Sequence, residues 1–162
     1  MKDILEKISS YNLFNYLLPG VIFAFLGQRL EIIALPKADI VVLAFLYYFI
    51  GMTVSRVGSL FMEPVFKRFK IVAYSPYADY LKASEKDPKM ASMIEANNTY
   101  RTLASTFFSL VVAFVVKVVA DRLGLSVEER EYWLAGGLFV LFVYSFRKQS
   151  AFIVSRVRHY AD

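Results

Sequence analysis

"DIVVLAFLYYFIGMTVSRVGSLFM", residues 39–62, is the stretch that decides the fold class. Between Asp39 and Met62 it holds a single charged side chain, Arg56. An α-helix rises about 1.5 Å per residue and the hydrocarbon core of a bilayer is about 30 Å thick, so about 20 apolar residues cross it. The stretch therefore predicts a transmembrane helix.

Two later segments are also long, mostly apolar runs. Residues 102–120, "TLASTFFSLVVAFVVKVVA", have the length of a crossing. Residues 132–146, "YWLAGGLFVLFVYSF", span only about 22 Å as a helix, so they cross if flanking side chains snorkel toward the interface. Both segments are predicted to be membrane helices.

The opening of the chain, "YNLFNYLLPGVIFAFLG" at residues 11–27, combines apolar residues with Asn12, Asn15 and Pro19. A helix that began at Pro19 would be too short to cross, whereas one from Tyr11 to Ile33 would span. Pro19 has no N–H for the carbonyl of Asn15, a loss that neighbouring helices can compensate in a membrane. We therefore expect a kinked crossing over 11–33.

These four segments predict an all-α, integral membrane four-helix bundle formed by one domain, residues 1–162. The chain is 57% hydrophobic, which excludes a disordered protein. It has no cysteine, so disulfides and thiolate chemistry are impossible.

The basic residues predict the orientation of the bundle. Residues 1–11, 62–101 and 147–162 hold 13 Lys and Arg, whereas the connections 29–39 and 121–131 hold 4. The positive-inside rule places the first group in the cytoplasm, so we expect a multi-pass protein of the cell inner membrane with both termini cytoplasmic. The net charge of +5 is then a topology signal, and no direct binding of nucleic acid is expected.

Residues 67–101 predict a cytoplasmic helical hairpin between the second and third crossings. Ser75–Pro76 and Asp87–Pro88 resemble helix starts, with proline at the first helical position. The second helix should continue into the third crossing, because nothing after Ile94 breaks it. The two helices either pack only on each other or also dock a cytosolic protein, through the predicted docking residues Tyr77, Tyr80, Met90 and Met93.

Residues 147–162 predict a cytoplasmic extension of the fourth helix. Its basic side chains either bind anionic lipid head groups or are simply solvated, and they are Arg147, Lys148, Arg156 and Arg158.

Charged residues inside predicted crossings are functional candidates by default. Arg56 either snorkels to the cytoplasmic interface and pairs with Glu63, or faces a subunit interface or pore. Lys117 lies close to the outer end of its helix, which favours snorkelling. Small residues that allow close helix packing, within or between subunits, are Gly51, Ser55, Ser59, Gly136 and Gly137.

Catalysis has little support in the sequence. The only histidine, His159, lies at the end of the chain, and no nucleotide-binding loop, nucleophile motif or metal-ligand pattern is present. We therefore expect a protein that is not an enzyme and that needs no metal or cofactor.

"ISSYNLFNYLLPGVIF" (8–23) and "EANNTYRTLASTFF" (95–108) resemble segments of small multi-pass membrane proteins of bacterial antiphage-defence systems, nearest the membrane subunit of Kiwa. The resemblance implies an inner-membrane homo-oligomer that holds a cytosolic partner and responds to infection. Together with the residues above, it favours a non-enzymatic scaffold or sensor whose partners are lipids, further copies of itself and a cytosolic protein.

The rival hypothesis is an oligomeric pore or membrane-depolarising effector. Its candidate lining residues are Arg56 and the polar side chains Thr53, Ser55 and Ser59.

Overall fold

The computed structural model describes residues 13–161, and every regular element among them is a helix. Asn12 and the predicted helix start at Tyr11 lie outside the described residues. In chain order the elements are the π-helix η1 (Leu13–Leu17), α2 (Leu18–Arg29), α3 (Ile40–Val57), the π-helix η2 (Gly58–Met62), α4 (Glu63–Arg68), α5 (Tyr77–Lys86), α6 (Lys89–Arg122) and α7 (Val127–Ala161).

Three helices are long and apolar enough to cross a membrane. They are Ile40–Arg68, which joins α3, η2 and α4, and the single helices α6 and α7. The predicted all-helical class and the membrane character are therefore confirmed at this level. The first predicted crossing is different, because α2 ends at Arg29 rather than at Ile33. The described helix from Leu13 to Arg29 is about 26 Å long.

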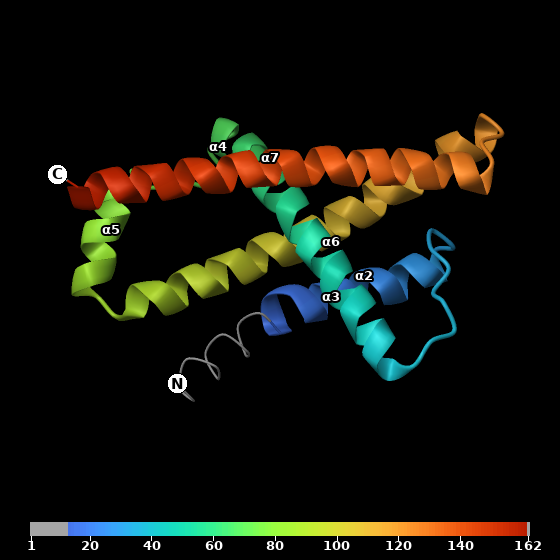
Figure 1. Cartoon of the computed structure of the whole chain (residues 1–162), viewed down its shortest axis with the longest axis horizontal. Helices are drawn as coiled ribbons and strands as arrows, with labels where there is room; N and C mark the ends of the chain where they lie inside the picture. Colours follow the sequence, from blue (N-terminus) through green and yellow to red (C-terminus); the bar gives the residue numbers. More distant parts are fainter. Residues whose placement is uncertain (1–12, 162) are drawn as a thin grey trace.

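The two longest helices, α6 and α7, give the molecule its length (Figure 1). They are joined by a short turn at one end, and α5 lies between them at the other, while α3 crosses them steeply. The turn needs Gly124, whose φ of 68° is left-handed. After it, the backbone N–H of Ser126 donates to Glu129 Oε2 at 2.7 Å and that of Glu129 donates to Ser126 Oγ at 3.2 Å, a capping box that starts α7.

Helices α2 and α3 meet through two glycines. A Cβ built on Gly20 would lie 1.7 Å from the carbonyl oxygen of Tyr47, and one built on Gly51 would lie 1.8 Å from that of Tyr16. The backbones therefore touch at a point where only glycine fits, as in other membrane helix pairs packed through small residues. Gly51, a predicted packing residue, lies at this close approach.

Each π-helix ends two residues before a proline, η1 before Pro19 and η2 before Pro64. A proline ring collides with the carbonyl four residues earlier, and widening the preceding turn relieves that collision. The predicted irregularity at Pro19 is therefore a π-turn, and the second crossing contains another.

Helix α7 is the outermost of the long helices. Among its described side chains only Leu141 and Ser145 are buried. Aromatic contacts attach it, Phe142 to Phe49 of α3 at 6.1 Å and Phe152 to Tyr77 of α5 at 5.7 Å between ring centroids. The tightly packed part of the fold is thus η1, α2, α3 and α6, with α7 placed against it.

The hairpin region differs in detail from its prediction. Pro76 and Pro88 each lie just before the first helical residue rather than at it, and the side chain of Ser75 does not cap α5. Asp87 Oδ1 accepts from the backbone N–H of Lys89 at 2.9 Å. Helix α6 is continuous from Lys89 to Arg122, as the absence of a break after Ile94 predicted.

Candidate functional site

A buried polar network links three helices at the middle of the fold. Thr102 Oγ1 lies 3.3 Å from Asn15 Oδ1, 3.2 Å from Ser55 Oγ and 2.8 Å from the carbonyl oxygen of Asn98. Its single proton serves one acceptor at a time, and its oxygen can accept from Ser55. Asn15, Ser55 and Thr102 are each no more than 2% exposed. The two segments that carry the resemblance, 8–23 and 95–108, therefore meet here.

The same face of α6 continues the network. Ser105 Oγ donates to the carbonyl oxygen of Val54 at 2.7 Å, and Thr106 Oγ1 donates to that of Thr102 at 2.9 Å. A Cβ on Gly58 would lie 3.1 Å from the Ser105 Cβ, so the helices approach closely. The Ser105 bond joins α6 to α3, and hydrogen bonds between membrane helices contribute about 0.6 kcal/mol each on average.

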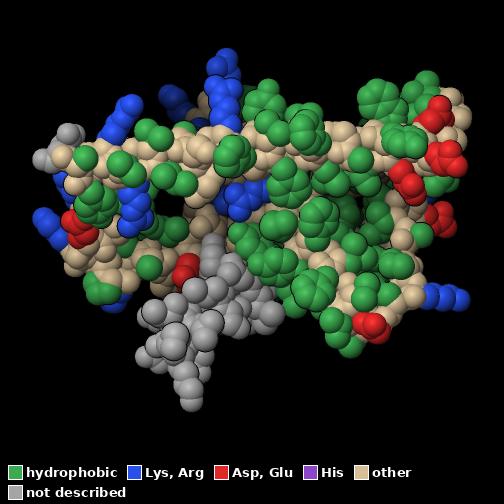
Figure 2. Space-filling view, in the orientation of Figure 1, with side chains coloured by type: hydrophobic (Ala, Val, Ile, Leu, Met, Phe, Trp, Pro, Cys, Tyr) green, Lys and Arg blue, Asp and Glu red, His purple; other side chains and the backbone are tan. Residues whose placement is uncertain are grey.

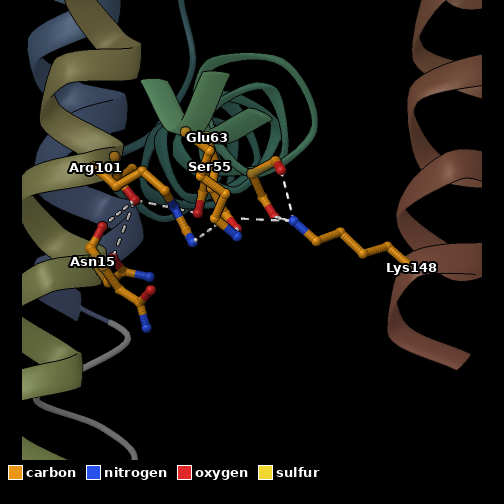
Figure 3. A network of polar contacts seen from close by, with 9 residues as sticks. Asn15, Ser55, Glu63, Arg101 and Lys148 are labelled. Carbon is orange, nitrogen blue, oxygen red and sulfur yellow. Dashed lines mark hydrogen bonds and ion pairs between the residues drawn. The ribbon is translucent and has the colours of Figure 1, made fainter. Parts of the chain in front are cut away.

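Next to this network lies an ion-pair cluster around Glu63, made of Glu63, Lys67, Arg101 and Lys148. Figure 3 shows Arg101 and Lys148 reaching Glu63 from two different helices. The Glu63 side chain is only 11% exposed. Its Oε1 is 2.8 Å from Lys67 Nζ, and its Oε2 is 3.2 Å from Arg101 Nη1 and 3.4 Å from Lys148 Nζ. One carboxylate therefore connects α4, α6 and α7.

Lys148 also bonds to Ser59 of η2, 2.7 Å from the carbonyl oxygen and 2.8 Å from Oγ. The carbonyl is available because of the π-turn. The backbone N–H of Glu63, which would donate to Ser59 in an α-helix, donates to Gly58 instead. The next residue, Pro64, has no N–H to offer. The ammonium of Lys148 therefore satisfies a carbonyl that its own helix leaves without a backbone donor.

Arg56 is placed differently from the prediction. Its Nη2 donates to the Tyr16 hydroxyl at 3.3 Å, and the ion pairs that Glu63 makes among the described residues go to other cations. Of the two alternatives for Arg56, the ion pair with Glu63 is therefore not formed among the described residues. Arg56 instead lines a small cleft of about 30 Å³ between α3, η2 and α7, together with Ser59, Leu60, Ser145, Lys148, Gln149 and Phe152.

The basic residues of α7 divide into two groups. For Lys148 the sequence left lipid binding and solvation open, and in the structure its ammonium instead faces inward to Ser59 and Glu63. Arg147, Arg156 and Arg158 are exposed, with Arg156 near the ring of Tyr160. At the other end of the molecule, Lys117 Nζ is 3.7 Å from Glu31 Oε2 in the loop after α2.

Of the four predicted docking residues, three are half-buried and one is exposed. Tyr77 and Tyr80 are half-buried and contact each other at 5.7 Å, and Tyr77 also contacts Phe152. They therefore connect α5 to α7 inside the chain. Met90 is half-buried, while Met93 is 63% exposed.

The predicted packing residues have different surroundings. Gly51 and Ser55 are buried, and Ser59 binds Lys148. Apart from its own turns of helix, nothing in the described chain lies within 4 Å of a Cβ built on Gly136 or Gly137. Those two glycines therefore pack against nothing within the described chain.

Arg101 and Thr102 were missed by the sequence reasoning. Both residues adjoin an apolar block, and the sequence alone places them only at the end of a predicted crossing. Their position after "NNTY" offered one signal, because polar residues at helical spacing continue into the membrane segment as Thr102, Ser105, Thr106 and Ser109.

No family model, curated protein or solved structure matches this chain. The function must therefore be argued from the arrangement of its own residues.

Proposed function

We propose that this chain is a non-enzymatic, multi-pass scaffold or sensor of the cell inner membrane that assembles as a homo-oligomer and docks a cytosolic protein. Both termini are cytoplasmic in this proposal, and η1 with α2 belongs to a fourth crossing. The supporting observation is the length of the two longest helices and the apolar surface at one end of them.

Helices α6 and α7 are about 51 and 52 Å long, whereas the hydrocarbon core is about 30 Å thick. If the apolar segments 102–120 and 132–146 lie in the membrane, both helices protrude on the same side. We call this part the platform: α5, residues 89–101 of α6 and residues 147–161 of α7.

Charge separates the two ends of the molecule. Acidic side chains gather over the turn between α6 and α7, while most Lys and Arg lie toward the platform and the middle (Figure 2). Residues 121–131 hold four acidic and two basic side chains, and residues 147–161 hold four basic and no acidic ones. This distribution favours a cytoplasmic platform.

The platform exposes apolar side chains that no membrane would cover there. Ile153, Val157 and Tyr160 follow helical spacing on α7 and are 56%, 62% and 58% exposed. Met93 and Tyr100 are exposed on α6. Exposed apolar patches in water mark protein contacts. Because Tyr77 and Tyr80 are used inside the chain, the proposed docking surface is this outer one, with Met93 retained from the prediction.

The homo-oligomer rests on Gly136 and Gly137, which would let a second copy approach α7 closely. The resemblance of residues 8–23 and 95–108 extends the proposal to antiphage defence. A pore is the weaker alternative, because two of its candidate lining residues are occupied: Ser55 is buried in the polar network and Ser59 binds Lys148.

The test is purification of the tagged full chain at native expression in mild detergent, with the mass and components of the complex determined. We expect a homo-oligomer with a stoichiometric soluble protein. Ile153→Asp with Val157→Asp should release that protein and leave the oligomer intact. Ser155→Asp, exposed between them on α7, is the matched control. A homo-oligomer with no soluble component would contradict the proposal and favour a pore.

A further inference from the structure

The ion-pair cluster around Glu63 carries more positive than negative charge. One carboxylate faces three cations, Lys67, Arg101 and Lys148, which leaves an excess of two positive charges. Arg56, which lines the adjoining cleft with Lys148, adds another. Uncompensated charge at a membrane helix is costly and attracts a counter-ion.

Arg56 has the donors to bind such an anion. Among the described residues no carboxylate lies within ion-pair distance of it, and its one hydrogen bond is to a neutral hydroxyl at 3.3 Å. A guanidinium has five N–H donors in a planar fork that matches two phosphate oxygens. The Gln149 amide lines the same cleft and offers further donors. Lys148 contributes charge, since its protons already face Ser59 and Glu63.

The surroundings of the cleft match a lipid better than a free ion. Leu60 and Phe152 lie in its wall, and Phe49 and Phe142 extend the same seam between α3 and α7 along the apolar segments. Acyl chains would contact these apolar side chains while the phosphate stays at the depth that Arg56 reaches by snorkelling. A soluble phosphate would gain nothing from them.

We propose that the cleft between α3, η2 and α7 binds the phosphate of an anionic phospholipid, held by Arg56 and Gln149 and attracted by the excess charge around Glu63. This site is separate from the exposed residues Arg147, Arg156 and Arg158. It requires that these helices lie in a membrane, and it does not depend on a docked partner or on the oligomer.

The test is lipid binding to the full chain in detergent, measured by native mass spectrometry and by thermal unfolding. Dioleoylphosphatidylglycerol, dioleoylphosphatidylcholine and inorganic phosphate are added at matched concentrations. We expect the phosphatidylglycerol to bind and to raise the melting temperature most. Arg56→Gln should weaken that binding about tenfold, the effect of losing one charge-assisted hydrogen bond. Arg147→Gln removes the same charge from an exposed position and should leave it nearly unchanged.

Three results would overturn the site. Equal losses in Arg56→Gln and Arg147→Gln would mean diffuse attraction to a basic surface. An equal shift with inorganic phosphate would assign the cleft to a free anion. If Arg56→Gln does not fold, Arg56→Lys is measured in its place, because it keeps the charge but lacks the planar guanidinium. Wild-type binding in Arg56→Lys would show that the guanidinium makes no directed contact.

Discussion

Substituting alanine for Gly51 tests the close contact of α3 with η1 and α2. Gly136→Ala, measured on the monomer in detergent so that no second copy contacts position 136, is its matched control, since both glycines lie inside membrane-length helices. A Cβ at position 51 would lie 1.8 Å from the carbonyl oxygen of Tyr16, whereas one at position 136 meets nothing within 4 Å. The two substitutions are chemically identical, so any difference between them comes from the surroundings.

The expected magnitude combines two opposing terms. Alanine in place of glycine favours a helix by roughly 1 kcal/mol at either position. At position 51 the helices must separate by about 1.6 Å to restore the 3.4 Å at which ordinary contact begins. The obstacle is a backbone carbonyl, which cannot rotate away as a side chain can. Overpacking costs up to about 3 kcal/mol. Gly51→Ala should therefore lose about 2 kcal/mol, while Gly136→Ala gains up to about 1 kcal/mol.

The measurement is thermal unfolding of both variants and the wild type in one detergent, followed by far-ultraviolet circular dichroism. For a chain of this size, a loss of 2 kcal/mol corresponds to a melting temperature lower by roughly 4–8 °C. Gly136→Ala should melt at or slightly above the wild type. If Gly51→Ala melts no lower than Gly136→Ala, the two backbones are not in contact at Gly51 and the described packing is wrong.

Three further predictions concern the polar contacts. Thr102→Val should destabilise the chain by about 0.6–1.7 kcal/mol in the same assay, since it removes a hydroxyl shared by three helices; an unchanged melting temperature would contradict the network. Glu63→Gln should cost about 3 kcal/mol, because it leaves partly buried cations without a counter-charge; a smaller loss than for Thr102→Val would count against the cluster. In this cysteine-free chain, Phe49→Cys with Phe142→Cys should react with a short thiol cross-linker, and adding Lys148→Ala should reduce the yield. An unaffected yield would mean that Lys148 does not hold α7.

The helices were largely predictable because uninterrupted apolar blocks have few alternatives. Residues 40–62 and 102–120 lie in membrane-length helices, and the polar run before Thr102 joins α6 because it contains no residue that stops a helix. The end of α2 was less predictable. Glu31 has a left-handed φ of 53°, and the backbone N–H of Ile32 donates to the carbonyl oxygen of Gly27, which ends the helix within an apolar sequence that composition alone would continue.

The direction in which individual charged residues face could not be predicted. Arg147 and Lys148 are neighbours in sequence, and both suit an interface. On a helix they point about 100° apart, so only one can face α3. Which one does depends on Glu63 and Ser59, more than eighty residues earlier. The same is true of Glu63, whose cations come from α4, α6 and α7 rather than from Arg56.

The proline at position 64 explains why Lys148 is the residue that faces inward. Proline inside a membrane helix leaves a carbonyl oxygen without its N–H donor. The sequence predicts this free carbonyl but does not identify the side chain that replaces the lost donor. The π-turn makes Ser59 the residue with the free carbonyl, and the ammonium of Lys148 is the donor that reaches it. Rotating α7 would break the contacts of Lys148 with both Ser59 and Glu63. These contacts therefore help to fix the rotation of α7, together with its aromatic contacts. Gly136 and Gly137 belong to the same helix, so in the proposed homo-oligomer these contacts also orient the two glycines toward the second copy.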